Sequence, residues 1–116
     1  MKKSLLFLFF AFVITDASTM DCSNTATQMR EVICSDPKLI TLYEDAHNTF
    51  YQVGNKVNIY NLPFFHMNFL TWKVHMEEEC VLDKNQKDSV GCLTTSISDE
   101  IKQLNDILNN PDWLEN

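Results

Sequence analysis

Residues 34–54, CSDPKLITLYEDAHNTFYQVG, contain a helix start signal followed by a regular apolar pattern. The side chain of Asp36 can cap a helix, and Pro37 suits the first helical position because its missing amide hydrogen would have no intrahelical partner there. Gly54 is a natural helix end. Between these signals, apolar residues recur every three or four positions and predict one buried helix face. That face contains Leu39, Leu42, Tyr43, Ala46, Phe50 and Val53.

A short helix is predicted before this segment. It should run from Gln28 to about Cys34, with Thr27 as its N-cap. A capping box of Thr25 and Gln28 is a competing interpretation that places the start two residues earlier. Either start produces one short helix before the longer one.

A third helix is predicted from about Pro63 to Glu79, after an irregular segment at residues 54–62. Leu70 and Val74 are expected to widen its buried stripe. Phe64 adds an aromatic side chain beyond what one stripe can bury, which could form an exposed patch, although core packing is the default expectation. The stripe itself contains Phe65, Phe69, Trp72, Met76 and Cys80.

A fourth helix is predicted after the polar segment at residues 83–89. It should stop at Asn109-Asn110-Pro111, and the tail from Asp112 is expected to fray. The sequence therefore predicts an all-α fold, a small disulfide-clipped bundle of one short N-terminal helix and three longer helices. The fourth helix should bury Leu93, Ile97, Ile101, Leu104 and Leu108.

An apolar leader precedes the helical part. Lys2 and Lys3 are followed by an uncharged apolar run from Leu5 to Ile14, which is typical of a secretory signal peptide. This run is about half of the ~20 apolar residues that a membrane-spanning helix needs. We expect residues 1–17 to be removed on export, and residues 18–116 to form one soluble periplasmic or secreted domain.

The mature chain is predicted to be strongly acidic. Removing Lys2, Lys3 and Asp16 with the leader lowers the 9 basic and 16 acidic residues to 7 and 15, a net charge of about −8 with neutral histidines. Such a surface repels phosphate backbones and anionic lipids, and it attracts cationic partners. We therefore expect a protein partner, no nucleic-acid ligand and no membrane insertion of the mature chain.

All four cysteines lie behind the leader in two equally spaced pairs, Cys22 with Cys34 and Cys80 with Cys92. An even number of cysteines in a short exported chain is typical of a disulfide framework. Sequence alone allows three pairings. We favour the sequential one, because a bond from Cys80 to Cys92 would clip a helical hairpin across its loop. Zinc binding is a less favoured alternative, because zinc half-sites usually space their cysteines two to four residues apart.

The sequence lacks the recognisable patterns of an active site. We find no nucleophile placed beside a histidine, no paired carboxylates in an apolar setting and no glycine-rich phosphate loop. His47, His66 and His75 are not spaced as a metal pair on one helix face, so surface or packing roles are predicted for them. We expect a protein that is not an enzyme and that needs no metal or cofactor.

Two segments contain candidate contact residues for a protein partner. The acidic run Glu77, Glu78 and Glu79 could dock a cationic protein, although a charged run at a helix end is more often a solvated face. Negative charges are unfavourable at a helix C-terminus, where the helix dipole is also negative, and this cost favours a functional role. The second segment is the irregular loop, since loops often carry recognition. Its candidate residues are Lys56, Tyr60 and Asn61.

Residues across most of the mature chain resemble a known family. They are Asp21-Cys22, Thr27, Ile33-Cys34-Ser35-Asp36-Pro37, Leu39, Leu42, Tyr51, Trp72, Cys80, Cys92-Leu93 and Ile101. In these features the chain resembles the LprI-type lysozyme inhibitor domain, which is found in small exported helical bacterial proteins. The resemblance implies a periplasmic or envelope protein that binds and inhibits lysozyme, and it implies no catalytic residues.

The chain departs from this family pattern after Trp72. The family usually has Trp-Leu and then a basic residue close before the third cysteine, whereas here an acidic run precedes Cys80 at a distance one residue longer. A surface of changed sign could bind a changed partner. We predict an exported binding protein that blocks a cationic cell-wall hydrolase such as lysozyme. The alternative is a non-enzymatic envelope interaction module or an immunity-type protein with another protein client.

Overall fold

The computed structural model describes residues 22–23 and 27–114. It contains the helices α2 (Gln28–Cys34), α3 (Pro37–Gly54), α4 (Leu62–Glu77) and α5 (Ser89–Ile107), with a π-helical turn, η1 (Glu78–Leu82), directly after α4. The predicted all-α fold with one short and three longer helices is confirmed. The predicted leader at residues 1–17 lies outside the described residues. Within the described ranges, no helix has both the length and the apolar character needed to cross a membrane.

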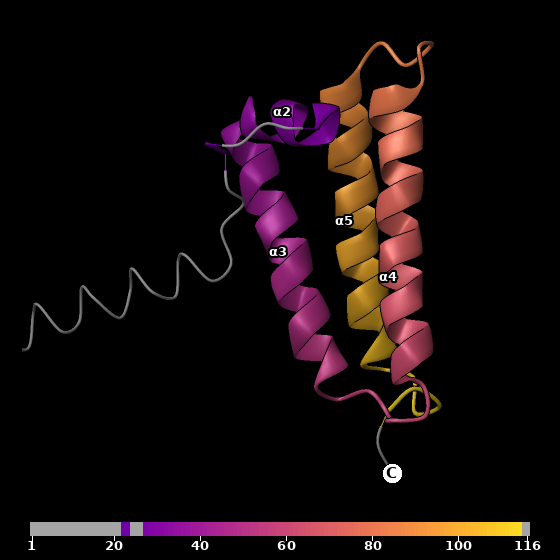
Figure 1. Cartoon of the computed structure of the whole chain (residues 1–116). Coiled ribbons are helices and arrows are strands. Elements are labelled where there is room, and N and C mark those ends of the chain that lie inside the picture. Colours follow the sequence, from indigo (N-terminus) through magenta and orange to yellow (C-terminus); the bar gives the residue numbers. More distant parts are fainter. Residues whose placement is uncertain (1–21, 24–26, 115–116) are drawn as a thin grey trace, which may run out of the picture.

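The three long helices lie side by side, and α2 lies across one end of them (Figure 1). Each long helix runs antiparallel to the next one along the chain. α3 packs most extensively against α5, although α4 lies between them in the sequence. α4 makes fewer contacts with either, so it is the outer helix of the bundle.

The first two helices begin at the predicted capping residues. Thr27 Oγ1 accepts a hydrogen bond from the backbone N–H of Arg30 at 3.2 Å. Asp36 Oδ1 accepts one from the backbone N–H of Lys38 at 2.9 Å, and Pro37 is the first residue of α3. These bonds satisfy N–H groups that a helix start otherwise leaves without a partner. The predicted caps and the predicted start of α3 are confirmed.

α5 begins with a cap that depends on a glycine. Asp88 Oδ1 accepts a hydrogen bond from the backbone N–H of Gly91 at 2.9 Å. A Cβ atom at position 91 would collide with the capping carboxylate. The absence of a side chain at Gly91 therefore lets Asp88 reach the helix end, and this cap places Cys92 in the first turn of α5.

The core consists of two apolar clusters that are joined by Trp72, which packs against both. Most of the residues predicted to face the core are buried in one of these clusters, while Leu42, Ile101 and Leu108 are half-buried at the margins. The first cluster contains Ile33, Leu39, Tyr43, Ala46, Met76, Cys80, Leu93 and Ile97. The second contains Phe50, Val53, Val57, Phe65, Phe69 and Leu104.

α4 differs from the prediction at its surface and at its end. Leu70 and Val74, which were expected to widen the buried stripe, are 57% and 55% exposed, because neighbouring helices cover only the opposite side of α4. Phe64 is 68% exposed, so the default expectation of core packing was wrong for this residue. The regular helix ends at Glu77, and η1 then carries the chain through the buried Cys80 to Leu82.

The end of the chain packs against the loop before α4, so the expectation that it frays was wrong for residues 112–114. Val57 and Leu114 form an isolated antiparallel bridge. The backbone N–H of Asn58 donates a hydrogen bond to the Trp113 carbonyl oxygen at 2.7 Å. Trp113 also packs against the second apolar cluster. Apolar burial by Val57 and Trp113 stabilises this contact.

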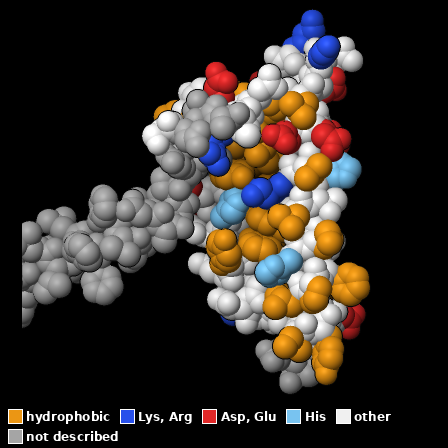
Figure 2. Space-filling model, in the orientation of Figure 1, with side chains coloured by type: hydrophobic (Ala, Val, Ile, Leu, Met, Phe, Trp, Pro, Cys, Tyr) orange, Lys and Arg blue, Asp and Glu red, His pale blue; other side chains and the backbone are white. Residues whose placement is uncertain are grey.

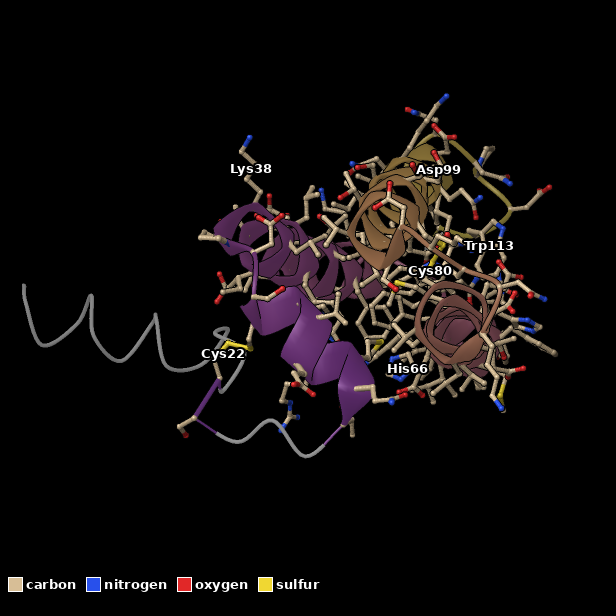
Figure 3. All side chains as sticks on the ribbon, turned by 90° about the horizontal axis from the view of Figure 1, so that it is seen from above. Cys22, Lys38, His66, Cys80, Asp99 and Trp113 are labelled. Atoms are coloured by element: carbon tan, nitrogen blue, oxygen red, sulfur yellow. A yellow bond between two sulfur atoms is a disulfide. The ribbon has the colours of Figure 1, made fainter. Side chains whose placement is uncertain are left out.

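Both predicted disulfides are present, and the sequential pairing is confirmed (Figure 3). The Cα atoms are 5.7 Å apart in the Cys22–Cys34 pair and 5.3 Å apart in the Cys80–Cys92 pair. The second bond joins η1 to the first turn of α5 and clips the helical hairpin as expected. A disulfide-bonded cysteine has no thiolate to bind a metal, so these cysteines do not form the alternative zinc site.

We predict that replacing both Cys80 and Cys92 with Ala lowers the free energy of unfolding by about 3 kcal/mol, because the bond closes a loop comparable to the ~15-residue case. The control is the double Ala variant of Cys22 and Cys34. It should lose less, because Cys80 is buried in the first cluster whereas Cys34 is half-buried. Thermal unfolding followed by circular dichroism measures both effects. An unchanged melting temperature without the Cys80–Cys92 bond would contradict this prediction.

Candidate functional site

The predicted contact residues lie at opposite ends of α4 and do not form one site. Glu77 is half-buried at the end of α4, whereas Glu78 and Glu79 are exposed at the start of η1. Lys56 and Tyr60 are exposed in the loop that precedes α4. Nearly the whole length of α4, from Leu62 to the residue before Glu77, separates the two groups. At the usual rise per residue, this corresponds to about 24 Å of helix.

The loop before α4 contains a turn at residues 58–61 with a well-defined backbone. The backbone N–H of Asn61 donates to the Asn58 carbonyl oxygen at 2.8 Å, which closes a β-turn. The side chain of Asn58 also accepts a hydrogen bond from the backbone N–H of Tyr60 at 2.9 Å. Asparagine is common in turns because its side chain can hydrogen-bond nearby backbone in this way. Hydrogen bonds inside the 58–61 turn therefore hold its backbone in one conformation.

The C-terminal tail also holds the turn. Asn61 Nδ2 donates a hydrogen bond to the Asp112 carbonyl oxygen at 2.8 Å, beside the bond from Asn58 to Trp113. The side-chain amide of Asn61, a predicted contact residue, is thus used within the protein. Sequence reasoning missed this role because the partner residue is 51 positions away.

The two central residues of the turn are apolar or aromatic and point into solvent. Ile59 is 71% exposed and Tyr60 is 83% exposed. Figure 2 shows further hydrophobic side chains at this lower end of the molecule and along α4. Side chains on a fixed backbone lose less conformational freedom on binding than those on a mobile loop. The turn is therefore a preorganised apolar projection.

An exposed apolar stripe on α4 continues from this end of the molecule. Met67 is 62% exposed, and it precedes Leu70 and Val74 at helical spacings of three and four residues. The stripe lies opposite the buried side of α4. Apolar residues on both sides of a helix are the sequence signal that could have identified this second surface.

A half-buried lysine joins α4 to α3. Lys73 Nζ lies 3.2 Å from His47 Nε2, and His47 Nδ1 lies 3.0 Å from the Tyr43 carbonyl oxygen. Nδ1 must carry the hydrogen that points at this carbonyl, so Nε2 accepts a hydrogen bond from the lysine. Lys73 Nζ is also 5.7 Å and 5.9 Å from the ring centroids of Tyr43 and Phe69. His47 thus has the packing role that the sequence predicts.

The same surroundings shift the pKa values of this pair. Burial lowers the pKa of the Lys73 ammonium. Burial is also the main cause of the lowered pKa of His47, which the bond to the Tyr43 carbonyl opposes and the Lys73 charge reinforces. A neutral imidazole and two aromatic rings therefore hold the lysine charge between the helices.

A groove of ≈ 570 Å³ lies between α4 and α5. Aromatic side chains of α4 form one wall, with Phe65, Phe69 and Trp72 among them. Trp72 Nε1 donates a hydrogen bond to Ser96 Oγ at 3.1 Å, which joins this wall to α5. The α5 side contains the polar residues Ser96, Asp99, Glu100 and Gln103 and the apolar residues Leu104 and Ile107.

Glu100 is the buried charged residue of this groove, and it was not predicted as a site residue. Its side chain is 8% exposed, and none of the described residues gives it a hydrogen bond or an ion pair. Burial raises the pKa of its carboxyl group to about 7. Its spacing from Ile97 and Leu104 places Glu100 on the buried side of α5. A charged residue on a side that is otherwise apolar is the sequence signal that could have identified Glu100.

The histidines and acidic residues do not form a metal site within the described residues: no group of three or more His, Cys, Asp or Glu side chains there could hold an ion. No protein-family model matches the chain, and no curated protein or solved structure is significantly similar to it. The resemblance to LprI-type domains thus stays a prediction.

We predict that Glu100→Gln stabilises the protein by about 2 kcal/mol at pH 8, after a discount for solvent screening in the groove, and has little effect at pH 4. Because the folded state raises the pKa of Glu100 from 4.5 to about 7, the carboxyl group favours unfolding as the pH rises through this interval. The free-energy cost of the buried carboxylate is absent below this pH interval and complete above it. Thermal unfolding at both pH values measures the effect, with the exposed Glu78→Gln as control. Equal stabilisation at both pH values would argue against a buried ionisable carboxylate.

Proposed function

We propose that this protein is an exported binding protein that blocks a cationic cell-wall hydrolase of the lysozyme type. The proposal joins the resemblance to LprI-type lysozyme inhibitors with one structural observation. This observation is the 58–61 turn, which projects Ile59 and Tyr60 into solvent on a hydrogen-bonded backbone. The turn is the element that would enter the cleft of the hydrolase.

The shape and chemistry of the turn suit an enzyme cleft. Substrate and ligand sites are concave and largely apolar with a few polar groups, so a convex apolar projection is complementary to them. Tyr60 combines an apolar ring with a hydroxyl group that can form a hydrogen bond. Tyrosine is also enriched among the residues that dominate interface energetics. Tyr60 is therefore the proposed anchor, with Ile59 beside it.

The acidic run at residues 77–79 has a different proposed role. The run lies at the far end of α4 from the turn. The separation between the two exceeds the screening distance of about 8 Å at physiological ionic strength. Its charges therefore act on encounter with a cationic protein and contribute little to the anchor contact itself. Electrostatic steering of this kind raises the association rate and weakens as salt is added.

The deciding test is lysis of cell walls by a chicken-type lysozyme in the presence of the purified, oxidised mature protein. We expect inhibition, and we expect Tyr60→Ala to weaken it at least tenfold, or by about 1.4 kcal/mol. The melting temperature should not change, because Tyr60 is 83% exposed. Leu82→Ala is the control, since Leu82 is a 51% exposed apolar residue in η1 at the other end of α4. No inhibition of this or other lysozyme types would overturn the proposal and favour another protein client.

The steering role is tested with the triple variant of Glu77, Glu78 and Glu79 to Gln. At low salt we expect the association rate to fall several-fold while the dissociation rate stays nearly constant, because long-range attraction acts before contact. At high salt the variant and the parent should associate equally fast. Surface plasmon resonance at several salt concentrations measures both rates, and an equal loss at all of them would mean that the acidic run contacts the partner directly.

A further inference from the structure

A second surface feature, the α4/α5 groove, lies on a different side of the molecule from the exposed face of α4. Viewed down the bundle, Asp99 of the groove projects from α5 on one side and His66 projects from α4 on the other (Figure 3). The inhibitor proposal uses neither the groove nor Glu100.

The energetic feature of the groove is the carboxylate of Glu100. A buried carboxylate normally has an ion-pair or hydrogen-bond partner, because an unpaired buried charge is costly. None of the described residues supplies one to Glu100. No side-chain oxygen or nitrogen of the described part is both fully enclosed and without a partner, so the Glu100 oxygens are reached from the groove. A ligand that enters the groove can therefore contact them.

The other side chains that line the groove favour a ligand of positive charge. Among the described residues, no lysine or arginine lines the groove, and its titratable groups beside Glu100 are His75 from α4 and Asp99 from α5. Burial is the cause of the raised pKa of Glu100. The lining also includes Trp72, and an indole ring favours cations and can pack against hydrocarbon. The surroundings thus favour a cation that carries an apolar segment.

We propose that the α4/α5 groove binds an ammonium or guanidinium group on a short carbon chain, with Glu100 as its counter-ion and Trp72 along the chain. The groove volume of ≈ 570 Å³ lies within the usual range for small-ligand sites. A free amine and a Lys or Arg side chain of a basic protein both have this chemistry. The bound cation supplies the partner that Glu100 otherwise lacks.

The test uses n-pentylammonium as the probe and 1-pentanol as the uncharged control of equal chain length. Trp72 and Trp113 are the two tryptophans, so Trp113→Phe leaves Trp72 fluorescence as a reporter from within the groove. We expect saturable binding of n-pentylammonium and at least tenfold weaker binding of pentanol. Glu100→Gln should reduce n-pentylammonium affinity at least tenfold, and the exposed Glu78→Gln should not change it.

The pH dependence provides a second readout. The Glu100 carboxyl group ionises around pH 7, while an alkylammonium stays protonated until about pH 10. Raising the pH from 6 to 8 should therefore increase n-pentylammonium affinity about tenfold. His75→Gln should keep this increase, and Glu100→Gln should abolish it. The comparison of the two variants assigns the pH dependence to Glu100 and not to the histidine of the groove.

Competition with chicken-type lysozyme distinguishes the two sources of the ligand. If n-pentylammonium displaces bound lysozyme, a basic side chain of the partner occupies the groove, and if both bind together, the groove accepts a free amine. Either result supports the cation site. A folded Glu100→Gln variant that binds n-pentylammonium as tightly as the parent would overturn it. The amine titration does not require lysozyme binding, so failure of one proposal leaves the other standing.

Discussion

The covalent bond between Cys80 and Cys92 is the constraint on which the arrangement of the outer helix depends. Cys80 is buried in the first apolar cluster, and its partner lies in the first turn of α5. The π-helical turn brings the end of α4 to this bond, and the Asp88 cap on Gly91 fixes where α5 begins. α4 and α5 make few direct contacts with each other, and the Trp72–Ser96 hydrogen bond joins them. The groove exists because the two helices are joined at their ends and separated along part of their length.

α4 also has two apolar sides, but the bundle covers only one of them. On the covered side, the Phe50 ring of α3 stacks against Phe65 and Phe69, with ring centroids 4.9 Å and 4.1 Å apart. On the other side, Met67, Leu70 and Val74 are exposed to solvent. The same helix therefore stabilises the core and presents an apolar surface that continues toward the 58–61 turn. This division explains how a domain of this size can combine a packed interior with a projecting apolar end.

Local signals account for what the sequence could predict. The Thr27 and Asp36 caps, Pro37 and the cysteine spacing act over a few residues, and both caps and both disulfides form as expected. The exposure of Leu70 and the packed tail depend on which distant segments meet, so periodicity alone could not supply them. The candidate site divides in the same way. The exposure of Tyr60 agrees with its place in an irregular loop, whereas the role of Asn61 depends on the distant Asp112.

Two charged residues occupy positions where helical spacing predicts apolar residues. The surroundings of the two charges differ. Lys73 lies between Phe69 and Met76 on α4, and its flexible stem lets the ammonium reach His47 and two aromatic rings. Glu100 lies between Ile97 and Leu104 on α5, but a carboxylate gains nothing from aromatic faces, and no donor of the described residues reaches it. The lysine therefore stabilises the contact between α3 and α4. The ionised glutamate lowers the free energy of unfolding, and the other interactions of the domain must offset this loss. A cation that enters the groove from solvent would pair with the ionised carboxylate and offset that loss without changing the fold.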